Sequence, residues 1–227
     1  MSRADQEYML EYLRAVLDKD EGRAKKVIGR MLDLELGMPE IFQVLAGAQF
    51  EIGDLWARGV ISVADEHFAT KTTLESIEMV SERLNRMRGR GRGRALLCTV
   101  EGEYHEVGLR MFSELLRNQG WETVLLGSNF SASALIERAK ATAGGIDLLC
   151  ISATMPSGVP LLLATLRKVR AEPLYGRTKL VIGGAAFRSK RNRLLMSESV
   201  AGKKLADYVS WKHDAALDYT ASLGKHD

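Results

Sequence analysis

The chain has 227 residues, of which 46% are hydrophobic and 27% charged, ordinary values for a globular protein and incompatible with wholesale disorder. No apolar run is long enough to span a bilayer, so a membrane protein is excluded, and the acidic N-terminal stretch is unlike a signal peptide, which predicts a cytoplasmic location. The net charge is +3, and four arginines in residues 88–94 exceed this total by themselves. We therefore expect the basic excess to be local to that tract. Cys98 and Cys150 lie in apolar runs and are expected to be buried thiols.

Residues 1–87 have the apolar spacing of four helices. The first ends near Leu17, and the second begins at Asp20 or Glu21. Pro39 suits the first turn of the third helix, and Ser62 opens a capping box for the fourth. Short connections between the helices predict an antiparallel four-helix bundle.

The tract 88–94 alternates arginine and glycine and is predicted to be a linker between two domains. An alternative is that this tract binds nucleic acid, which would make the affinity steeply dependent on salt.

Residues 95–227 alternate short apolar runs with amphipathic stretches, which is typical of strands followed by helices. Near-continuous apolar strands indicate a parallel sheet with both faces covered. We predict an α/β domain with a flavodoxin-like (Rossmann-like), doubly wound, five-stranded sheet. Ligands of such domains bind beyond the carboxyl ends of the strands. The expected strands are residues 95–100, 123–126, 147–152, 180–183 and 208–210.

The loop after the first expected strand holds one imidazole, His105, with Glu103 two residues before it. A carboxylate bonded to one ring nitrogen fixes the tautomer of a histidine and strengthens the other nitrogen as a metal ligand. One histidine cannot build a structural zinc site, but it can be the axial ligand of a metal that a macrocycle already holds. An ordinary surface histidine is the alternative.

Small residues end the third and fourth expected strands, namely Ser152 and Thr154 in one loop and Gly183 and Gly184 in the other. Small side chains leave room for a long ligand tail, although glycine after a strand is more often only a turn.

In the helical half, Trp56 precedes a helix break, and Glu66 and His67 lie in the first turns of the next helix. An aromatic ring beside an acid and an imidazole suits one face of a large flat cofactor. The alternative is a core tryptophan with a glutamate that interacts with the helix dipole.

The pattern Glu103-x-His105-x-x-Gly108 resembles the cobalamin-binding domain shared by methionine synthase and corrinoid mutases, which usually has aspartate at the first position. Ser152-x-Thr154 and Gly183-Gly184 fit the same resemblance. The domain would bind cobalamin with the cofactor's own lower base displaced. The resemblance implies His105 Nε2 on cobalt, Glu103 as the partner of His105, and the nucleotide tail beside the small residues.

Trp56, nine further residues and Glu66-His67 resemble the signature of CarH-type cobalamin photoreceptors, and the likeness covers about residues 5–225. It implies that Trp56, Glu66 and His67 pack on the 5′-deoxyadenosyl group of adenosylcobalamin. Light would break the cobalt–carbon bond and displace the bundle, so the protein would be a sensor and not an enzyme.

The sequence departs from that family in three ways. The bundle starts within the first ten residues, so we expect neither a preceding DNA-binding module nor direct DNA binding. Ala57 replaces a histidine that captures cobalt after photolysis, and Tyr104 replaces an arginine used in tetramer contacts. These differences suggest a stand-alone sensor that acts on a separate effector protein, as a homo-oligomer and more readily a dimer than a tetramer. Some stand-alone relatives, the photocobilins, add a bilin, and noncovalent bilin binding is an open alternative.

A corrinoid shuttle protein for methyl transfer is the main alternative function, because it has the same arrangement of bundle and sheet domain. Trp56, Glu66 and His67 weigh against a shuttle, which must expose the upper face of its cofactor to partner enzymes.

Overall fold

The computed structural model describes residues 2–84, 91–142, 144–200 and 202–223, except for the side chains of residues 200 and 203. The chain divides into two compact units, Met1–Arg86 and Met87–Asp227. Residues 85–90, which include part of the predicted linker, lie outside the described residues, and Arg94 already belongs to the first strand. No helix in the described parts of the chain is long and apolar enough to cross a membrane.

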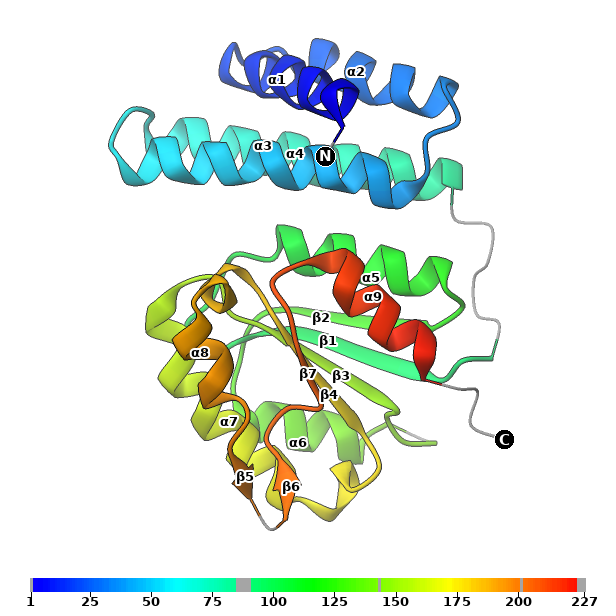
Figure 1. Cartoon of the computed structure of the whole chain (residues 1–227), viewed down its shortest axis with the longest axis vertical. Coiled ribbons are helices and arrows are strands. Elements are labelled where there is room, and N and C mark those ends of the chain that lie inside the picture. Colours follow the sequence, from blue (N-terminus) through cyan, green and yellow to red (C-terminus); the bar gives the residue numbers. More distant parts are fainter. Residues whose placement is uncertain (1, 85–90, 143, 201, 224–227) are drawn as a thin grey trace. The chain divides into compact units, whose positions relative to one another are not determined.

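The first unit is helical, as predicted (Figure 1). Pro39 lies in the first turn of the third helix. The capping box of the fourth helix is also confirmed, because the amide of Asp65 donates to Ser62 Oγ over 3.2 Å and the amide of Ser62 donates to Asp65 Oδ2 over 2.9 Å. These bonds satisfy amides that the helix itself leaves without partners. The helices are α1 (Arg3–Leu17), α2 (Glu21–Asp33), α3 (Met38–Ala57) and α4 (Val63–Leu84).

The core of this unit contains one buried polar cluster. Tyr12 is fully buried, and its hydroxyl lies 3.2 Å from Thr73 Oγ1 and 3.0 Å from Ser76 Oγ. The cluster joins α1 to α4 at a fixed register, since a buried hydroxyl is costly unless it is hydrogen-bonded.

The second unit is a parallel five-stranded sheet with strand order β2-β1-β3-β4-β7, which confirms the doubly wound prediction. Helices α5 and α9 cover one face and α6 and α7 the other (Figure 1). The order reverses between β1 and β3, so the loops after these two strands flank the expected binding position. The strands are β1 (Arg94–Val100), β2 (Glu122–Phe130), β3 (Leu148–Ser152), β4 (Lys179–Gly183) and β7 (Tyr208–Val209). The helices are α5 (Val107–Asn118), α6 (Ala132–Lys140), α7 (Val159–Ala171), α8 (Lys190–Leu195) and α9 (His213–Ser222).

Two features of this unit differ from the sequence prediction. Strand β2 runs four residues past the predicted end, because Gly127, with a φ of +92°, takes up an irregularity in the pairing with β1 and lets the strand continue. A short antiparallel hairpin, β5 (Ser199–Val200) with β6 (Lys203–Lys204), was not predicted. The remaining short elements are the 3-10 turns η1 (Pro156–Gly158), η2 (Pro173–Tyr175) and η3 (Ala185–Arg188).

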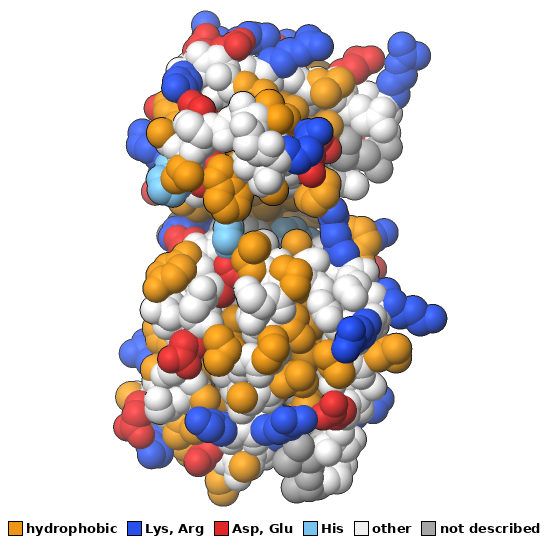
Figure 2. Space-filling view, turned by 90° about the vertical axis from the view of Figure 1, so that its left-hand side faces the viewer, with side chains coloured by type: hydrophobic (Ala, Val, Ile, Leu, Met, Phe, Trp, Pro, Cys, Tyr) orange, Lys and Arg blue, Asp and Glu red, His pale blue; other side chains and the backbone are white. Residues whose placement is uncertain are grey.

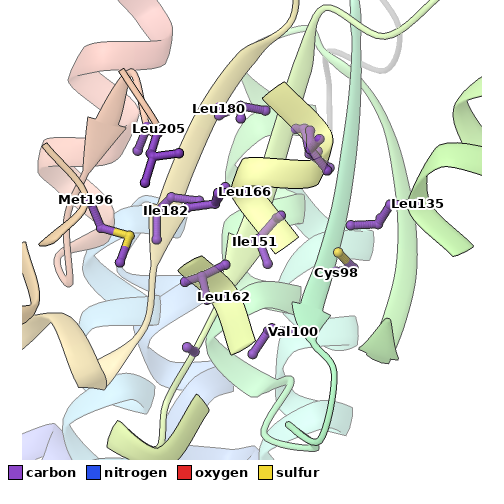
Figure 3. Packing of buried hydrophobic residues seen from close by; sticks show 14 of the residues in the cluster. Cys98, Val100, Leu135, Ile151, Leu162, Leu166, Leu180, Ile182, Met196 and Leu205 are labelled. Atoms are coloured by element: carbon purple, nitrogen blue, oxygen red, sulfur yellow. The ribbon is translucent and has the colours of Figure 1, made fainter. Parts of the chain in front are cut away.

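A continuous apolar core holds α6 and α7 on the sheet (Figure 3). Side chains of the central strands, such as Ile151 and Ile182, pack against Leu162 and Leu166 of α7. Cys98 belongs to this core, and Cys150 is buried too, as expected. The core fixes the strands in register, so the loops at their carboxyl ends start from a rigid base.

Candidate functional site

The loop after β1 is held in place by Thr99 and Asn129. The Thr99 hydroxyl donates to the carbonyl of Glu103 over 2.5 Å and accepts from the amide of Asn129 over 2.9 Å. Asn129 Oδ1 accepts from the amide of Gly102 over 2.8 Å. Gly102 has a φ of +79° and Asn129 a φ of +63°, and glycine and asparagine tolerate this left-handed region best. The loop is therefore braced from the neighbouring strand β2.

Glu103 is the centre of the site. Its side chain is only 2% exposed, and both carboxylate oxygens are used. Oε1 accepts from the amides of Tyr104 and His105, each over 3.1 Å, and bonds to His105 Nδ1. Oε2 accepts from the amides of Thr154 and Met155 over 2.8 and 2.9 Å. One carboxylate thus connects the loop after β1 to the loop after β3.

These contacts keep Glu103 ionised. Burial by itself raises the pKa of the carboxyl group, but the hydrogen bonds from the His105 ring and from the amides of Met155, His105 and Thr154 outweigh burial. Together they lower the pKa from its ordinary value of 4.5 to about 2. Glu103 therefore presents a negative charge to the imidazole at every physiological pH.

His105 is oriented by that charge. Its side chain is 48% exposed, and its Nδ1 faces Glu103 Oε1. A carboxylate acceptor requires the proton on Nδ1, which leaves Nε2 with the lone pair that binds metals. The predicted pairing of Glu103 with His105 is present in the structure. With the ring orientation fixed in this way, His105 Nε2 could supply one nitrogen ligand to a metal ion.

The small residues at the ends of β3 and β4 lie side by side, because Ser152 pairs with Gly183 across the sheet. Gly184 has a φ of +103°, and a Cβ there would lie 2.2 Å from the carbonyl oxygen of Ala153. The space beside this glycine is therefore filled by the neighbouring loop, and backbone packing requires the glycine. Thr154 takes part through its amide, which bonds to Glu103. The slot for a ligand tail between these residues stays a prediction.

Gly108, the last residue of the pattern, lies in the first turn of α5 against α9. A Cβ at Gly108 would lie 3.7 Å from His213 Nε2, and the His213 ring stacks on Phe112 with centroids 6.0 Å apart. Burial lowers the pKa of His213, although a bond to the Gly108 backbone and nearby Asp214 oppose that effect. His213 is therefore held neutral in the packing of α9 on α5.

In the helical unit, the three predicted residues belong to the end of α3 and the start of α4. Trp56 is 38% exposed and is not a core tryptophan. Thr70 Oγ1 donates to Glu66 Oε1 over 2.8 Å and accepts from Gln49 Nε2 over 3.1 Å. His67 is exposed, with its Nε2 3.7 Å from Glu66 Oε2. Glu66 is thus fixed by a chain of side chains from α3 and α4.

Sequence reasoning missed Thr99, Asn129 and the amide of Met155. The one local signal was Asn129, because asparagine adopts the left-handed conformation more readily than most residues. The contact from Glu103 to Met155 spans 52 residues and leaves no local pattern.

Comparison with protein families finds a B12 binding domain in residues 93–204. Residues 10–81 match a second model that is also described as a B12 binding domain. The two matches fall in the sheet unit and the helical unit, and they indicate a cobalamin or related corrinoid as the cofactor.

The relatives are corrinoid proteins. A corrinoid protein of Desulfitobacterium hafniense is 23% identical over 179 residues, which cover 77% of this chain and 82% of that protein. The dimethylamine corrinoid protein of Methanosarcina barkeri is 28% identical over 171 residues, 75% of each chain. The solved structure of the M. barkeri monomethylamine corrinoid protein has the same fold, with a TM-score of 0.79 at 19% identity over 97% of this chain and all of that one.

The prediction of a CarH-type photoreceptor is wrong. It relied on Trp56, Glu66 and His67, and these relatives show that a helical unit joined to this sheet domain occurs in corrinoid proteins named for methylamines. Adenosylcobalamin and a bilin were predicted from that resemblance. The family matches support a cobalamin or corrinoid cofactor, but they support neither adenosylcobalamin in particular nor a bilin. The chain therefore contains a B12-binding domain at residues 93–204, preceded by a second B12-binding match, and its homologues are corrinoid proteins.

Proposed function

We propose that this protein carries a corrinoid for methyl transfer between partner enzymes, and is not itself the catalyst of the transfer. The observation that carries the proposal is the arrangement of Glu103 and His105, together with relatives named as dimethylamine and trimethylamine corrinoid proteins. When bound, the corrinoid supplies a cobalt atom that accepts a methyl group and releases it again.

In this proposal His105 would bind the cobalt of the corrinoid through Nε2. Glu103 holds the proton on Nδ1, so the ring cannot turn its protonated nitrogen toward the metal. Five donors converge on the Glu103 carboxylate, which fits a group that must stay charged beside a metal ligand. The site would therefore suit a metal-binding imidazole whose donor strength is set by its carboxylate partner.

The other predicted residues keep proposed roles as corrinoid contacts. Ser152, Thr154, Gly183 and Gly184 border the carboxyl edge of β3 and β4, where ligands of this fold bind. Trp56, Glu66 and His67 are proposed to contact the corrinoid from the helical unit. In this proposal the corrinoid would carry a methyl group. The bilin is dropped, because it rested on the photoreceptor resemblance alone. A homodimer stays a prediction, which light scattering tests.

The visible spectrum of the cobalamin-loaded protein tests the proposed ligand. We expect wild type to show a nitrogen-ligated cobalt, whereas His105→Ala shifts the spectrum of bound cobalamin to the base-off form. His226→Ala is the matched imidazole control, because no role in the site is proposed for His226, and its cobalamin spectrum should equal that of wild type. An unchanged spectrum in His105→Ala would exclude His105 as the ligand.

Methyl carriage is tested separately with a methyltransferase and an isotopically labelled methylamine. The label should appear on the cobalamin of the wild-type protein and leave it when a thiol acceptor and its methyltransferase are added. Protein that binds cobalamin but never carries label with mono-, di- or trimethylamine would contradict the proposal.

A further inference from the structure

The charge of the chain is distributed unevenly. Residues 159–212 contain twelve lysines and arginines and only three acidic residues, a net charge of +9, so the remainder of the chain is acidic with a net charge of −6. The expectation that the basic excess is local to residues 88–94 is therefore wrong. In Figure 2, Lys and Arg side chains (blue) are spread over the visible face of the unit that contains the sheet, with Asp and Glu side chains (red) between them.

Part of this charge gathers at the carboxyl ends of β4 and β7. We define the basic surface as Arg188, Lys190, Arg191, Trp211 and Lys212, all of which are exposed. The first three follow β4 in η3 and the first turn of α8, and the other two follow β7.

The basic surface adjoins the candidate site. The loop after β7 begins next to the end of β4, where the amide of Ser210 donates to the carbonyl of Ile182 over 3.0 Å. The carbonyl oxygen of Ser210 lies 3.4 Å from the Cβ position of Gly183, which pairs with Ser152. The surface thus continues the edge on which the loops of Glu103 and Thr154 lie.

Trp211 is the centre of this surface. It is 40% exposed, with the Arg188 guanidinium 5.0 Å and Lys212 Nζ 5.2 Å from its ring centroid. Among the ion pairs of the described residues, none involves Lys190, Arg191 or Lys212. The acidic residue nearest to Lys212 in the sequence is Asp214, and its carboxylate accepts a hydrogen bond from the amide of Ala215. Lys190, Arg191 and Lys212 are therefore not neutralised by ion pairs within the described chain.

We propose that the basic surface docks an acidic surface of the enzyme that exchanges the methyl group, a proposal that rests on the carrier function above. A carrier must bring its cofactor to another protein, and this surface borders the site. Tryptophan and arginine dominate the energetics of protein interfaces, and opposite charges guide the approach of two proteins. Nucleic acid fits less well, because it stacks bases on open aromatic faces, whereas two cations already lie over Trp211.

Photo-cross-linking of the full, cobalamin-loaded chain in its own cells identifies the partner. Leu194→p-benzoylphenylalanine places the probe on α8, where the side chain is 60% exposed. Leu174→p-benzoylphenylalanine is the matched control, since it is 49% exposed in η2 at the amino end of β4. We expect position 194, and not position 174, to link to a protein segment rich in aspartate and glutamate. A link to nucleic acid, to a segment without acidic excess, or no link would overturn the proposal.

Titration with the purified partner then measures the affinity of docking. We expect Lys212→Glu to raise the Kd at least about tenfold at low salt, with the difference shrinking at high salt. Arg177→Glu reverses an exposed charge before β4 and should leave the Kd near that of wild type. Equal effects of the two variants would refute the docking surface. The cobalamin spectrum of Lys212→Glu should match wild type, so failure of the surface is distinguishable from failure of cofactor ligation, which only His105→Ala reports.

Discussion

Replacing Glu103 by glutamine tests the energetic role of its carboxylate. The amide keeps the size of the side chain but turns one acceptor oxygen into a donor. That donor must face either the amides of Thr154 and Met155 or the amides of Tyr104 and His105, all of which are donors themselves. One set of bonds is lost in a site where the side chain is 2% exposed.

The size of the effect follows from the pKa. A shift from 4.5 to about 2 corresponds to about 3 kcal/mol of folding free energy when the carboxyl group is ionised. Because the folded-state pKa is the lower one, this stability is fully present above about pH 4.5. It is lost as the pH falls toward 2. We therefore expect Glu103→Gln to lower the unfolding free energy by about 3 kcal/mol at pH 7 and by much less near pH 2.

Urea unfolding of the full chain between pH 2 and 7, followed in the transition of the sheet unit, measures this difference. Glu101→Gln is the control, since it removes an exposed carboxylate from the same loop and should change stability by less than about 0.5 kcal/mol. A Glu103→Gln variant within 1 kcal/mol of wild type at pH 7, or a deficit that does not shrink on acidification, would refute the reasoning.

Three further predictions concern packing. Gly184→Ala should cost at least about 2 kcal/mol in urea unfolding, because a Cβ would lie 2.2 Å from the carbonyl oxygen of Ala153, whereas Gly183→Ala should cost less, and equal costs would contradict the close approach. Tyr12→Phe should lower the stability of the helical unit by about 1 kcal/mol, since the buried hydroxyls of Thr73 and Ser76 each lose one hydrogen bond, and circular dichroism during thermal melting measures the loss. Burial raises the pKa of the Cys98 thiol to about 12, so a thiol reagent at pH 8 should react only on unfolding, and rapid labelling of the native protein would count against this.

The periodic parts of the fold could be predicted from the sequence, since their signal is local. Buried parallel strands are apolar throughout, as in residues 95–100, and helices carry caps such as the pair Ser62 and Asp65. The end of β2 was missed because Gly127 and the polar residues after it look like a turn, and only pairing with β1 extends the strand through them.

The site was predictable only in part, for the same reason. Glu103 and His105 are two residues apart, so their pairing has a local pattern, and the structure contains it. The bonds from Glu103 to Thr154 and Met155 join residues about fifty positions apart, and no propensity or spacing encodes them. Trp56, Glu66 and His67 led to the wrong class of protein, because an exposed tryptophan followed in the sequence by an acid and an imidazole suits more than one class of corrinoid protein.

The Glu103 carboxylate also limits how the site can open. Separating the loop after β1 from the loop after β3 would strip Oε2 of both its amide donors while Oε1 stays bound to the first loop. A buried carboxylate that loses half of its hydrogen bonds costs free energy, so the two loops move together around His105. Any displacement of the Thr154–Met155 backbone is therefore transmitted to the imidazole, and the strength of the proposed metal ligand is coupled to the conformation of the loop after β3.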